Sequence, residues 1–351
     1  MPRLTADILG QPASLNRVLL HQCGVGRAAL LAAAARVRAS RKIVIVGMGA
    51  SLNAAIPLEY LLCAHGLDAL SIEAGELLHY RLEAYEGATF LVVSRSGESI
   101  EIVKLLSALR GRGTTIGLTN DPDSTLARGA DIALELQSLA DEMVAIQTHT
   151  GTLLTLYLLG MAAINELSRA QEELEALLVL LPNWIAHQLD ALTSWDPFLE
   201  CDAPVYTLGR GPSYGSALQG ALLFSEIAKA PAVGMAVASF RHGPVEVVDS
   251  RFRGLIFAPQ GRTRELNVAM AHELVRFGGS VRLIGPEARD NATTPWVLTP
   301  SCSEFLAPMV EIVPLQMAAL RLAQLRGLAV GSFRFAPQVS RDESCIAVGR
   351  L

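Results

Sequence analysis

Residues 88–113, ATFLVVSRSGESIEIVKLLSALRGRG, contain the pattern that decides the fold. The first six residues form an apolar, β-branched run that is typical of a strand buried on both faces of a sheet. The run ends in a Ser/Gly turn at residues 94–99, and an amphipathic helix with a glycine stop follows. A buried strand that leads directly into a helix is half of a βαβ unit, so the stretch predicts an α/β protein with a parallel sheet.

The same alternation extends along most of the chain. KIVIVGMG (residues 42–49) predicts another buried strand, which a helix over residues 51–66 follows. The remaining strands of this half are expected at residues 68–74, 114–120 and 130–136. A helix over residues 141–164 is expected to close it. A second series starts after the irregular stretch SWDPFLECDAP (residues 194–204). Its strands are expected at residues 205–211, 253–261 and 280–286, and its helices at 213–230, 263–279 and 305–327.

Two pairs of turns show that the second series repeats the first. GMGAS (residues 47–51) corresponds to GRGPS (209–213), and SRSGES (94–99) corresponds to APQGRT (258–263). A repeat at about 160 residues indicates duplicated domains and not a solenoid. The predicted parts are an N-terminal helical segment (1–40), two α/β domains (41–190 and 191–335) and a C-terminal tail (336–351).

Composition and charge indicate a well-packed globular protein. Of 351 residues, 51% are hydrophobic and 18% are charged, which excludes a disordered chain, and the net charge of −5 disfavours nucleic acid as a partner. The N-terminal segment lacks the basic start and apolar core of a signal peptide, and no apolar run reaches the roughly 18 residues of a membrane span. The five cysteines are scattered without metal-ligand spacing. A reduced, cytoplasmic protein without a metal site or membrane contact is expected.

The turn at residues 94–99 is a candidate anion site. It joins a strand to a helix, where unpaired backbone N–H groups and the helix dipole favour an anion. The hydroxyls of Ser94, Ser96 and Ser99 are possible donors to phosphate oxygens, and Gly97 permits a close approach of the backbone. The alternative is an ordinary helix N-cap in which the serines satisfy the start of the helix.

The turn GMGAS does not support a dinucleotide site. It contains the first two glycines of the G-x-G-x-x-G pattern, but Leu52 or Asn53 stands where the third glycine belongs. No acidic residue stands about 20 residues further on at the end of a clear second strand, although Glu73 is not far from that place. A nicotinamide-dependent enzyme is therefore the weaker interpretation.

Two residues of the second half are candidates for acid/base chemistry. Glu226 lies on an otherwise apolar helix, and His242 lies in the RHGPVE loop 16 residues later. A carboxylate on an apolar helix face is either a solvated edge or a base with a raised pKa. Isomerisation of a sugar requires such a base to move a proton between adjacent carbons.

Four segments together resemble the tandem sugar-isomerase (SIS) domain family. They are SRSGES, LGRGPSYGSALQGALLFSEI, RHGPVEVV and LAPMVEIVPLQMAALRLAQLRG, in the order and at the spacing of that family from about Lys42 to Ser340. The family includes the isomerase half of glucosamine-6-phosphate synthase, sugar-phosphate isomerases, aminosugar-phosphate deaminases and deglycases of phosphorylated Amadori products. The resemblance implies two doubly wound, flavodoxin-like parallel-sheet domains.

The resemblance also implies roles for individual residues. Glu226 matches the glutamate that moves a proton between C1 and C2, and His242 matches the ring-opening histidine, often supplied by the partner subunit. A homodimer with shared sites follows, without a cofactor or metal. The positions that match the family's phosphate-binding loop are Ser51, Ser94, Ser96, Gly97 and Ser99. The positions expected to line the site are Ala50, Arg95, His149, Gln338 and Arg341.

Three departures from the family limit this interpretation. Ala50 replaces a threonine of the first turn, and Leu223 replaces a lysine three residues before the glutamate. Gln338 replaces a second lysine in the tail, where the nearby Arg341 supplies a cation that cannot release a proton. The glutaminase half of the synthase has no counterpart, so transfer of ammonia from glutamine is not expected.

The expected function is therefore the binding of a hexose or aminosugar 6-phosphate, with isomerisation or deamination of the sugar. Two alternatives stay open: a deglycase of fructosamine phosphates, and a non-catalytic sensor that has lost catalysis with the two lysines.

Overall fold

The computed structural model describes residues 3–286, 294–330, 333–335 and 339–344. The chain divides into two compact units. The N-terminal unit comprises Ala13–Leu174 and Phe333–Leu351, and the C-terminal unit comprises Met1–Pro12 and Glu175–Ser332. This division falls inside the helices α1 (Arg3–Cys23) and α8 (Leu167–Asp190), which each supply residues to both units. The domain boundaries given by the sequence stay predictions.

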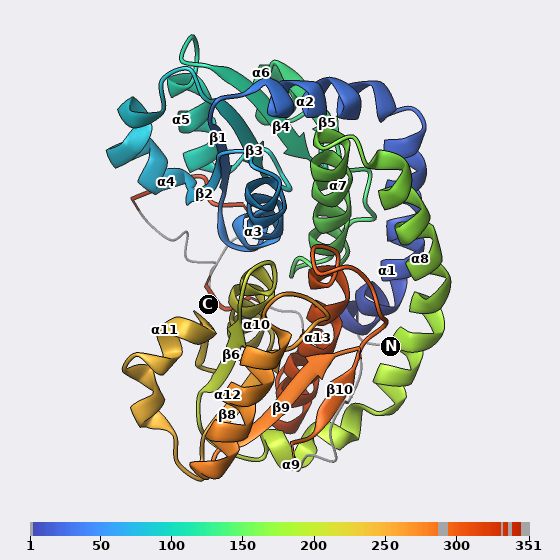
Figure 1. The fold of residues 1–351 in the computed structure, drawn as a ribbon, viewed down its shortest axis with the longest axis vertical. Helices are drawn as coiled ribbons and strands as arrows, with labels where there is room; N and C mark the ends of the chain where they lie inside the picture. The colour runs from blue at the N-terminus through green and yellow to red at the C-terminus, as the bar shows by residue number, and fades with distance from the viewer. Residues whose placement is uncertain (1–2, 287–293, 331–332, 336–338, 345–351) are drawn as a thin grey trace. The chain divides into compact units, whose positions relative to one another are not determined.

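The N-terminal unit is built on a parallel five-stranded sheet (Figure 1). The strands lie in the order β2-β1-β3-β4-β5, and each neighbouring pair is parallel. They are β1 (Ile43–Gly47), β2 (Ala69–Glu73), β3 (Thr89–Val93), β4 (Thr114–Thr119) and β5 (Ile132–Glu135). Every residue of β1 and β3 is buried, because helices cover both faces of a parallel sheet.

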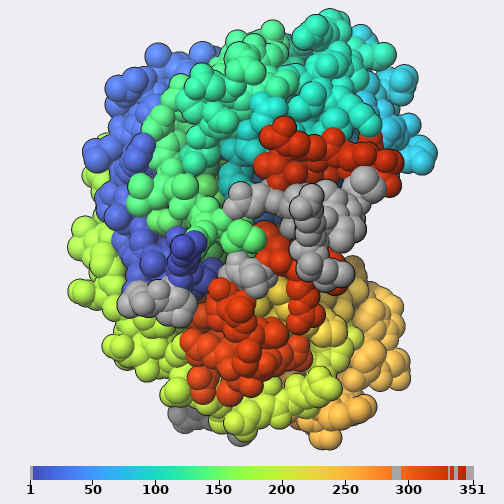
Figure 2. Space-filling view, turned by 180° about the vertical axis from the view of Figure 1, so that it is seen from behind, coloured from blue at the N-terminus to red at the C-terminus, as the bar shows by residue number. Residues whose placement is uncertain are grey.

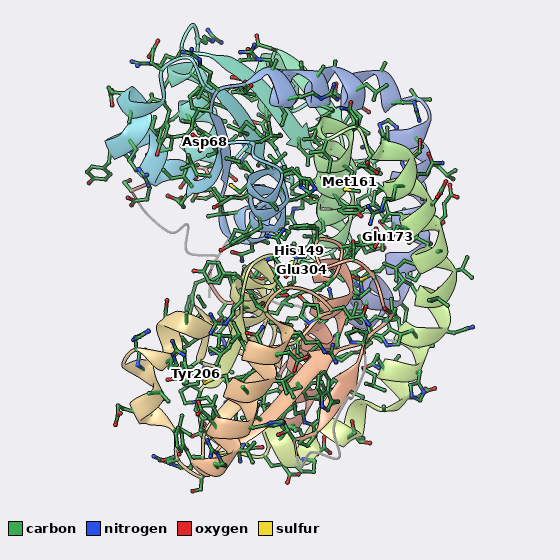
Figure 3. All side chains as sticks on the ribbon, in the orientation of Figure 1. Asp68, His149, Met161, Glu173, Tyr206 and Glu304 are labelled. Atoms are coloured by element: carbon green, nitrogen blue, oxygen red, sulfur yellow. The ribbon has the colours of Figure 1, made fainter. Side chains whose placement is uncertain are left out.

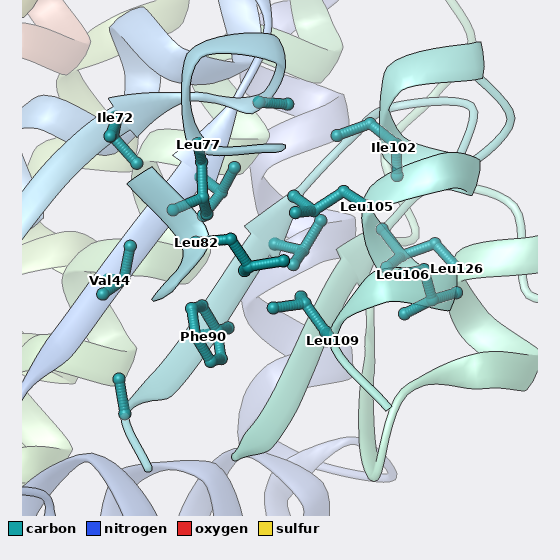
Figure 4. Packing of buried hydrophobic residues seen from close by; sticks show 14 residues of the cluster. Val44, Ile72, Leu77, Leu82, Phe90, Ile102, Leu105, Leu106, Leu109 and Leu126 are labelled. Carbon is teal, nitrogen blue, oxygen red and sulfur yellow. The ribbon is translucent and has the colours of Figure 1, made fainter. Parts of the chain in front are cut away.

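The helices of this unit pack against its strands or against one another. They are α2 (Arg27–Ala39), α3 (Gly49–Ala64), α4 (Ala74–Glu76), α5 (Ile100–Ala108), α6 (Thr125–Gly129) and α7 (Gln147–Ala163). Figure 4 shows one part of the core, in which Val44 and Phe90 of the strands pack with Leu105 and Leu106 of α5 and Leu126 of α6. Burial of each such side chain stabilises the fold by about 1.5–3 kcal/mol.

The C-terminal unit repeats this architecture. Its sheet has the order β10-β9-β8-β6-β7, again with parallel neighbours. The strands are β6 (Val205–Gly209), β7 (Ala232–Ala236), β8 (Arg253–Phe257), β9 (Ser280–Gly285) and β10 (Trp296–Leu298). Besides its part of α8, its longer helices are α10 (Ser213–Ala228), α12 (Arg264–Arg276) and α13 (Pro308–Leu325), and α11 (Val237–Arg241) is a short one.

The two sheets have the same strand order when each is numbered along the chain. In both, the second strand lies outside the first, and the third, fourth and fifth follow on the other side. This 2-1-3-4-5 order is typical of flavodoxin-like doubly wound folds, so the predicted duplication and fold class are confirmed. Strands β7 and β10 were not predicted.

The strand order also predicts where a ligand crevice is expected in each unit. Ligands of doubly wound folds bind beyond the carboxyl ends of the strands, at the point where the strand order reverses. In the N-terminal unit this point lies between β1 and β3, and residues 47–51 and 94–99 follow these two strands. In the C-terminal unit it lies between β6 and β8, and residues 209–213 and 258–263 follow them.

Among the described residues, no single helix has the length and apolar character that crossing a membrane requires. Helices α1 and α2 meet that requirement only when they are taken together across a bend of 74°.

Candidate functional site

The serine turn of the N-terminal unit is held by hydrogen bonds to its own backbone. Ser94 directly follows β3 and is 5% exposed, and its Oγ accepts a hydrogen bond from the Gly97 N–H at 3.1 Å. The Oγ of Ser96 accepts from the Glu98 N–H at 3.2 Å. A serine hydroxyl that accepts through its oxygen still has its own hydrogen to donate. Both side chains can therefore stabilise the turn and bind an anion at the same time.

Gly97 is required by both the backbone and the packing of this turn. Its φ of +63° lies in the left-handed region, and a Cβ at this position would be 2.3 Å from Ser124 Oγ. Ser124 is already engaged as the N-cap of α6, where its side chain accepts from the Ala127 N–H. Only glycine allows the turn to lie against α6.

Replacing Gly97 by alanine is expected to lower the free energy of unfolding by about 2 kcal/mol and to weaken ligand binding, because the turn must move away from Ser124. Gly111→Ala is the matched control. Gly111 also has a positive φ, of +77°, but nothing lies within 4 Å of the added Cβ. Urea denaturation of both variants separates backbone strain from the collision. Equal losses in the two variants would show that the contact with Ser124 is unimportant.

The side chain of Glu98 is bonded to the start of α6. Its carboxylate accepts from the Thr125 N–H at 2.5 Å and from Thr125 Oγ1 at 3.0 Å, at the start of α6. A carboxylate is favourable at a helix N-terminus because of the helix dipole. The one acidic side chain within SRSGES is therefore tied to a neighbouring helix.

The N-terminus of α5 is not capped by the side chain of its N-cap residue. Ser99 is the N-cap residue, but its side chain makes no capping hydrogen bond. The Ile100 N–H instead donates to the backbone oxygen of Ser340 at 3.0 Å, from the tail of the chain. One helix donor is thus satisfied by the tail, while the Ser99 hydroxyl is not used to cap the helix.

The turn after β1 is positioned by His149. Gly49 has a φ of +47°, and Ser51 lies in the first turn of α3, where no side chain caps the helix. The Ala50 backbone oxygen accepts from Nδ1 of His149 at 3.2 Å. His149 lies in the first turn of α7 and is 4% exposed (Figure 3).

His149 is neutral at physiological pH. Burial lowers its pKa from 6.5 to about 4, although the bond to Ala50 opposes the shift. The residue therefore holds the turn through a hydrogen bond and does not offer a positive charge to a ligand. Its proposed place in the lining of the site is compatible with this contact.

Asp141 is a residue of this region that the sequence analysis did not single out. Its carboxylate accepts from the Gln147 N–H at 2.7 Å, the Thr148 N–H at 3.1 Å and the Thr148 hydroxyl. Burial raises the pKa of Asp141, and these bonds oppose the rise. The predicted helix from Asp141 therefore begins only at Gln147. The Asp141 carboxylate accepts from the first two N–H groups of this helix and so fixes the turn that carries His149.

Three other residues expected to line the site lie in the serine turn (Arg95) and in the tail (Gln338 and Arg341). The Arg95 guanidinium donates to the Met143 backbone oxygen at 3.4 Å. Arg341 is exposed in the tail, and Gln338 lies outside the described residues.

The tail segment 339–344 lies on the surface of the N-terminal unit (Figure 2). Besides the bond from Ile100 to Ser340, Glu343 accepts from His79 Nε2 and from Lys104 Nζ, each at 2.5 Å. The tail is therefore anchored along α5, the helix that begins at the serine turn.

The candidate acid/base residues lie on helix α10 and at the end of helix α11 of the C-terminal unit, and strand β7 separates these two helices in the chain. Glu226 is half-buried near the end of α10, where its backbone oxygen accepts a hydrogen bond from the Lys229 ammonium. Strand β7 follows, and His242 is exposed as the C-cap of α11. Leu223, at the position of the family lysine, is fully buried in α10. The lysine is thus replaced by a core side chain.

A buried carboxylate at the start of α13 was also missed. Glu311 is 1% exposed and accepts from the hydroxyls of Ser213 and Ser216. The signal was present, because a glutamate interrupts the otherwise apolar stretch APMVEIVPL. Over the described residues, no group of three or more His, Cys, Asp and Glu side chains is placed to hold a metal ion.

The SIS domain model matches residues 37–165 and again residues 198–326. An isomerizing glutamine–fructose-6-phosphate aminotransferase of Pyrococcus horikoshii is 28% identical over 294 residues, which are 82% of this chain and 49% of that protein. The corresponding aminotransferase of Zymomonas mobilis is 30% identical over 307 residues, which are 83% of this chain and 50% of that protein. The chain thus spans about half the length of these curated relatives.

Similarity of fold covers nearly the whole chain. The C-terminal domain of glucosamine-fructose-6-phosphate aminotransferase from Francisella tularensis has a TM-score of 0.82 at 22% identity, over 94% of this chain and 98% of that chain. Each of the two matched segments contains one five-stranded sheet and one pair of the repeated turns. The chain therefore belongs to the SIS domain family and carries two SIS domains in tandem.

Proposed function

We propose that the protein binds a hexose or aminosugar phosphate and isomerises or deaminates it. The phosphoryl group would lie at the carboxyl edge of the N-terminal sheet, between the turns at residues 47–51 and 94–99. The observation that carries the proposal is the bonding of Ser94 and Ser96, whose oxygens accept backbone N–H groups while their hydrogens stay available to a phosphoryl oxygen. The similarity to isomerizing glutamine–fructose-6-phosphate aminotransferases supports the substrate class.

In this proposal the residues of the N-terminal unit bind the phosphate. Ser51 and Ser99 add hydroxyls to those of Ser94 and Ser96. His242 assists ring opening, and Glu226 moves the proton between C1 and C2. The family resemblance favours a homodimer in which His242 is supplied by the partner chain.

The presence of Leu223 at the position where the family has a lysine favours a second candidate function. Leu223 is fully buried, so no ammonium group can act from that position of α10. A chain that keeps the phosphate turn and lacks this group would act as a sensor that binds sugar phosphates without consuming them. A deglycase of fructosamine phosphates is a further catalytic alternative, because it also needs a proton shuttle at C1 and C2.

A panel of hexose and aminosugar 6-phosphates tests these functions. At about 100 times its Kd, a ligand that binds only the folded protein adds about 2.7 kcal/mol and raises Tm by roughly 5–10 °C. An enzyme would also release ketose, aldose or ammonia, whereas a sensor would leave the ligand unchanged.

Matched variants locate the binding site. Ser96→Ala is expected to reduce or abolish the Tm shift, because it removes a donor to the phosphoryl group. Ser107→Ala, on the exposed part of α5, should keep the full shift. If no phosphorylated sugar raised Tm, or if Ser96→Ala kept the full shift, the proposed site would be wrong.

A further inference from the structure

The two units place different side chains at equivalent positions of their crevices. In each unit the first strand leads through a G-x-G turn into a long helix, α3 or α10, and a second, mostly buried helix, α7 or α13, closes the unit. Ser51 of the N-terminal unit corresponds to Ser213 of the C-terminal unit. The first turn of α7 carries His149, and the first turn of α13 carries Glu311.

Glu311 has the hydrogen bonds that a bound anion would have. One carboxylate oxygen accepts from Ser213 Oγ at 2.8 Å, and the other accepts from Ser216 Oγ at 2.7 Å. Both serines lie in the first turns of α10, where the helix dipole favours negative charge. The carboxylate is buried and belongs to the protein itself. In the N-terminal unit, by contrast, His149 bonds to the backbone oxygen of Ala50 and not to the hydroxyl of Ser51.

The second turn of the C-terminal crevice has lost two of the three hydroxyl donors and keeps one, that of Thr263, at the position of Ser99. Ala258 and Gln260 stand where the N-terminal unit has Ser94 and Ser96. A second carboxylate, that of Glu304, lies against this turn. It accepts from the Arg262 N–H at 3.4 Å, and a Cβ on Gly261 would be 2.4 Å from its carboxyl carbon.

These contacts make the C-terminal crevice unsuitable for a phosphorylated ligand. A phosphate would displace a carboxylate that already bonds to Ser213 and Ser216, and it would lie close to the charge of Glu304. Burial is the main cause of the raised pKa of Glu311, and the charge of Glu304 adds to the rise. The negative charge of Glu304 opposes the entry of a further anion.

We propose that Glu311 occupies, in the C-terminal unit, the place that the phosphoryl group of the ligand occupies in the N-terminal unit. Each chain then binds one sugar phosphate and not two. The ratio of one ligand per chain rests on the proposed function. The internal site formed by Glu311, Ser213 and Ser216 does not depend on it.

Chemical rescue tests the internal site. Glu311→Ala removes the carboxylate and leaves the two serine hydroxyls facing an empty space of similar size, so formate should bind there. Formate is expected to raise the Tm of Glu311→Ala by at least about 2 °C more than the Tm of the wild type. Formamide, a neutral molecule of the same shape, should give a smaller shift. Glu311→Gln still fills the space and serves as the matched control that formate does not rescue.

The same experiment can overturn the proposal. Equal effects of formate on the wild type, Glu311→Ala and Glu311→Gln would show that no anion site was opened. Failure of Glu311→Ala to fold both with and without formate would also contradict the proposal, because an added carboxylate should replace the lost one.

The binding ratio is measured separately by calorimetry on the wild type with a sugar phosphate that raises its Tm. One ligand per chain is expected, and two per chain would overturn the inference. If no sugar phosphate binds while formate still rescues Glu311→Ala, the proposed function fails and the internal site stands. The two failures are therefore distinguishable.

Discussion

Replacing Glu226 by glutamine is expected to lower the turnover of a sugar phosphate by about 10²–10⁴-fold while its affinity changes by less than about tenfold. Glutamine has nearly the same size and stays polar, but it cannot accept and return a proton. Glu226 lies near the carboxyl end of α10, a helix that packs against β7 and α13. The position is therefore firmly supported, and the substitution removes the chemistry of the side chain with little change of shape.

Single-turnover assays with the sugar phosphate identified by thermal shift provide the measurement. Glu273→Gln is the control, because Glu273 is a glutamate on α12 of the same unit whose ion pair with Arg276 is exposed. This control should keep full turnover. Full activity in Glu226→Gln would show that another group moves the proton.

The same variant separates the enzyme from the sensor. A sensor does not turn over its ligand, so Glu226→Gln and the wild type would both bind it and both leave it unchanged. An enzyme would show a loss in kcat without a matching loss in binding. The split between binding and turnover therefore decides between the two candidate functions.

The fold could be predicted because its signals are local in the sequence. The central strands are apolar runs such as residues 43–47 and 89–93, since parallel strands are buried on both faces. Strand β7, AVGMA, has only one β-branched residue and is half-buried throughout, so it lacks that signal. Strand β10 is only three residues long. Both lie outside the central three strands of their sheet, where the pattern is weakest.

The serine turn could be predicted for the same reason, whereas the long-range contacts of both crevices could not. Ser94, Ser96 and Gly97 act within a few residues of one another. His149 bonds to a residue 99 positions away, and Glu311 bonds to residues 98 and 95 positions away. No period or motif connects such pairs. Glu311 on an apolar helix was visible in the sequence, but its partners depend on the packing of α10 against α13.

The buried side chains of Glu311 and His149 make the stability of the two units depend on pH in opposite directions. Burial raises the pKa of Glu311 from 4.5 to about 7, against the hydrogen bonds from Ser216 and Ser213. Between these pH values the folded C-terminal unit keeps a proton that the unfolded chain releases. The contribution of Glu311 to the free energy of unfolding is therefore fully present below pH 4.5. It is lost as pH rises through about 7, and the loss amounts to about 3 kcal/mol.

His149 has the opposite sign in the N-terminal unit. Its pKa falls from 6.5 in the unfolded chain to about 4 in the folded protein. Between these values the unfolded chain binds a proton that the folded unit cannot accept. The contribution of His149 is present above pH 6.5 and is lost as pH falls through about 4, again by about 3 kcal/mol.

The three tryptophans allow the two units to be followed separately. Trp184, Trp195 and Trp296 all lie in the C-terminal unit, so their fluorescence reports its unfolding. Hydrogen exchange of the strands β1 and β3 reports the N-terminal unit. From pH 7.5 to pH 5, the wild-type C-terminal unit should gain stability from Glu311 while the N-terminal unit loses stability through His149.

Two substitutions that keep the shape but do not titrate should remove these opposite trends one at a time. Glu311→Gln should flatten the pH dependence of urea unfolding measured by tryptophan fluorescence and leave the exchange of β1 and β3 unchanged. His149→Asn, whose amide can still donate to the Ala50 oxygen, should flatten the loss of protection in β1 and β3 at low pH and leave the fluorescence transition unchanged. A Glu311→Gln variant with the wild-type slope would mean that another group titrates in that unit. If His149→Asn still lost protection at pH 5, the acid sensitivity of the N-terminal unit would have to come from a group other than the histidine that holds its first turn.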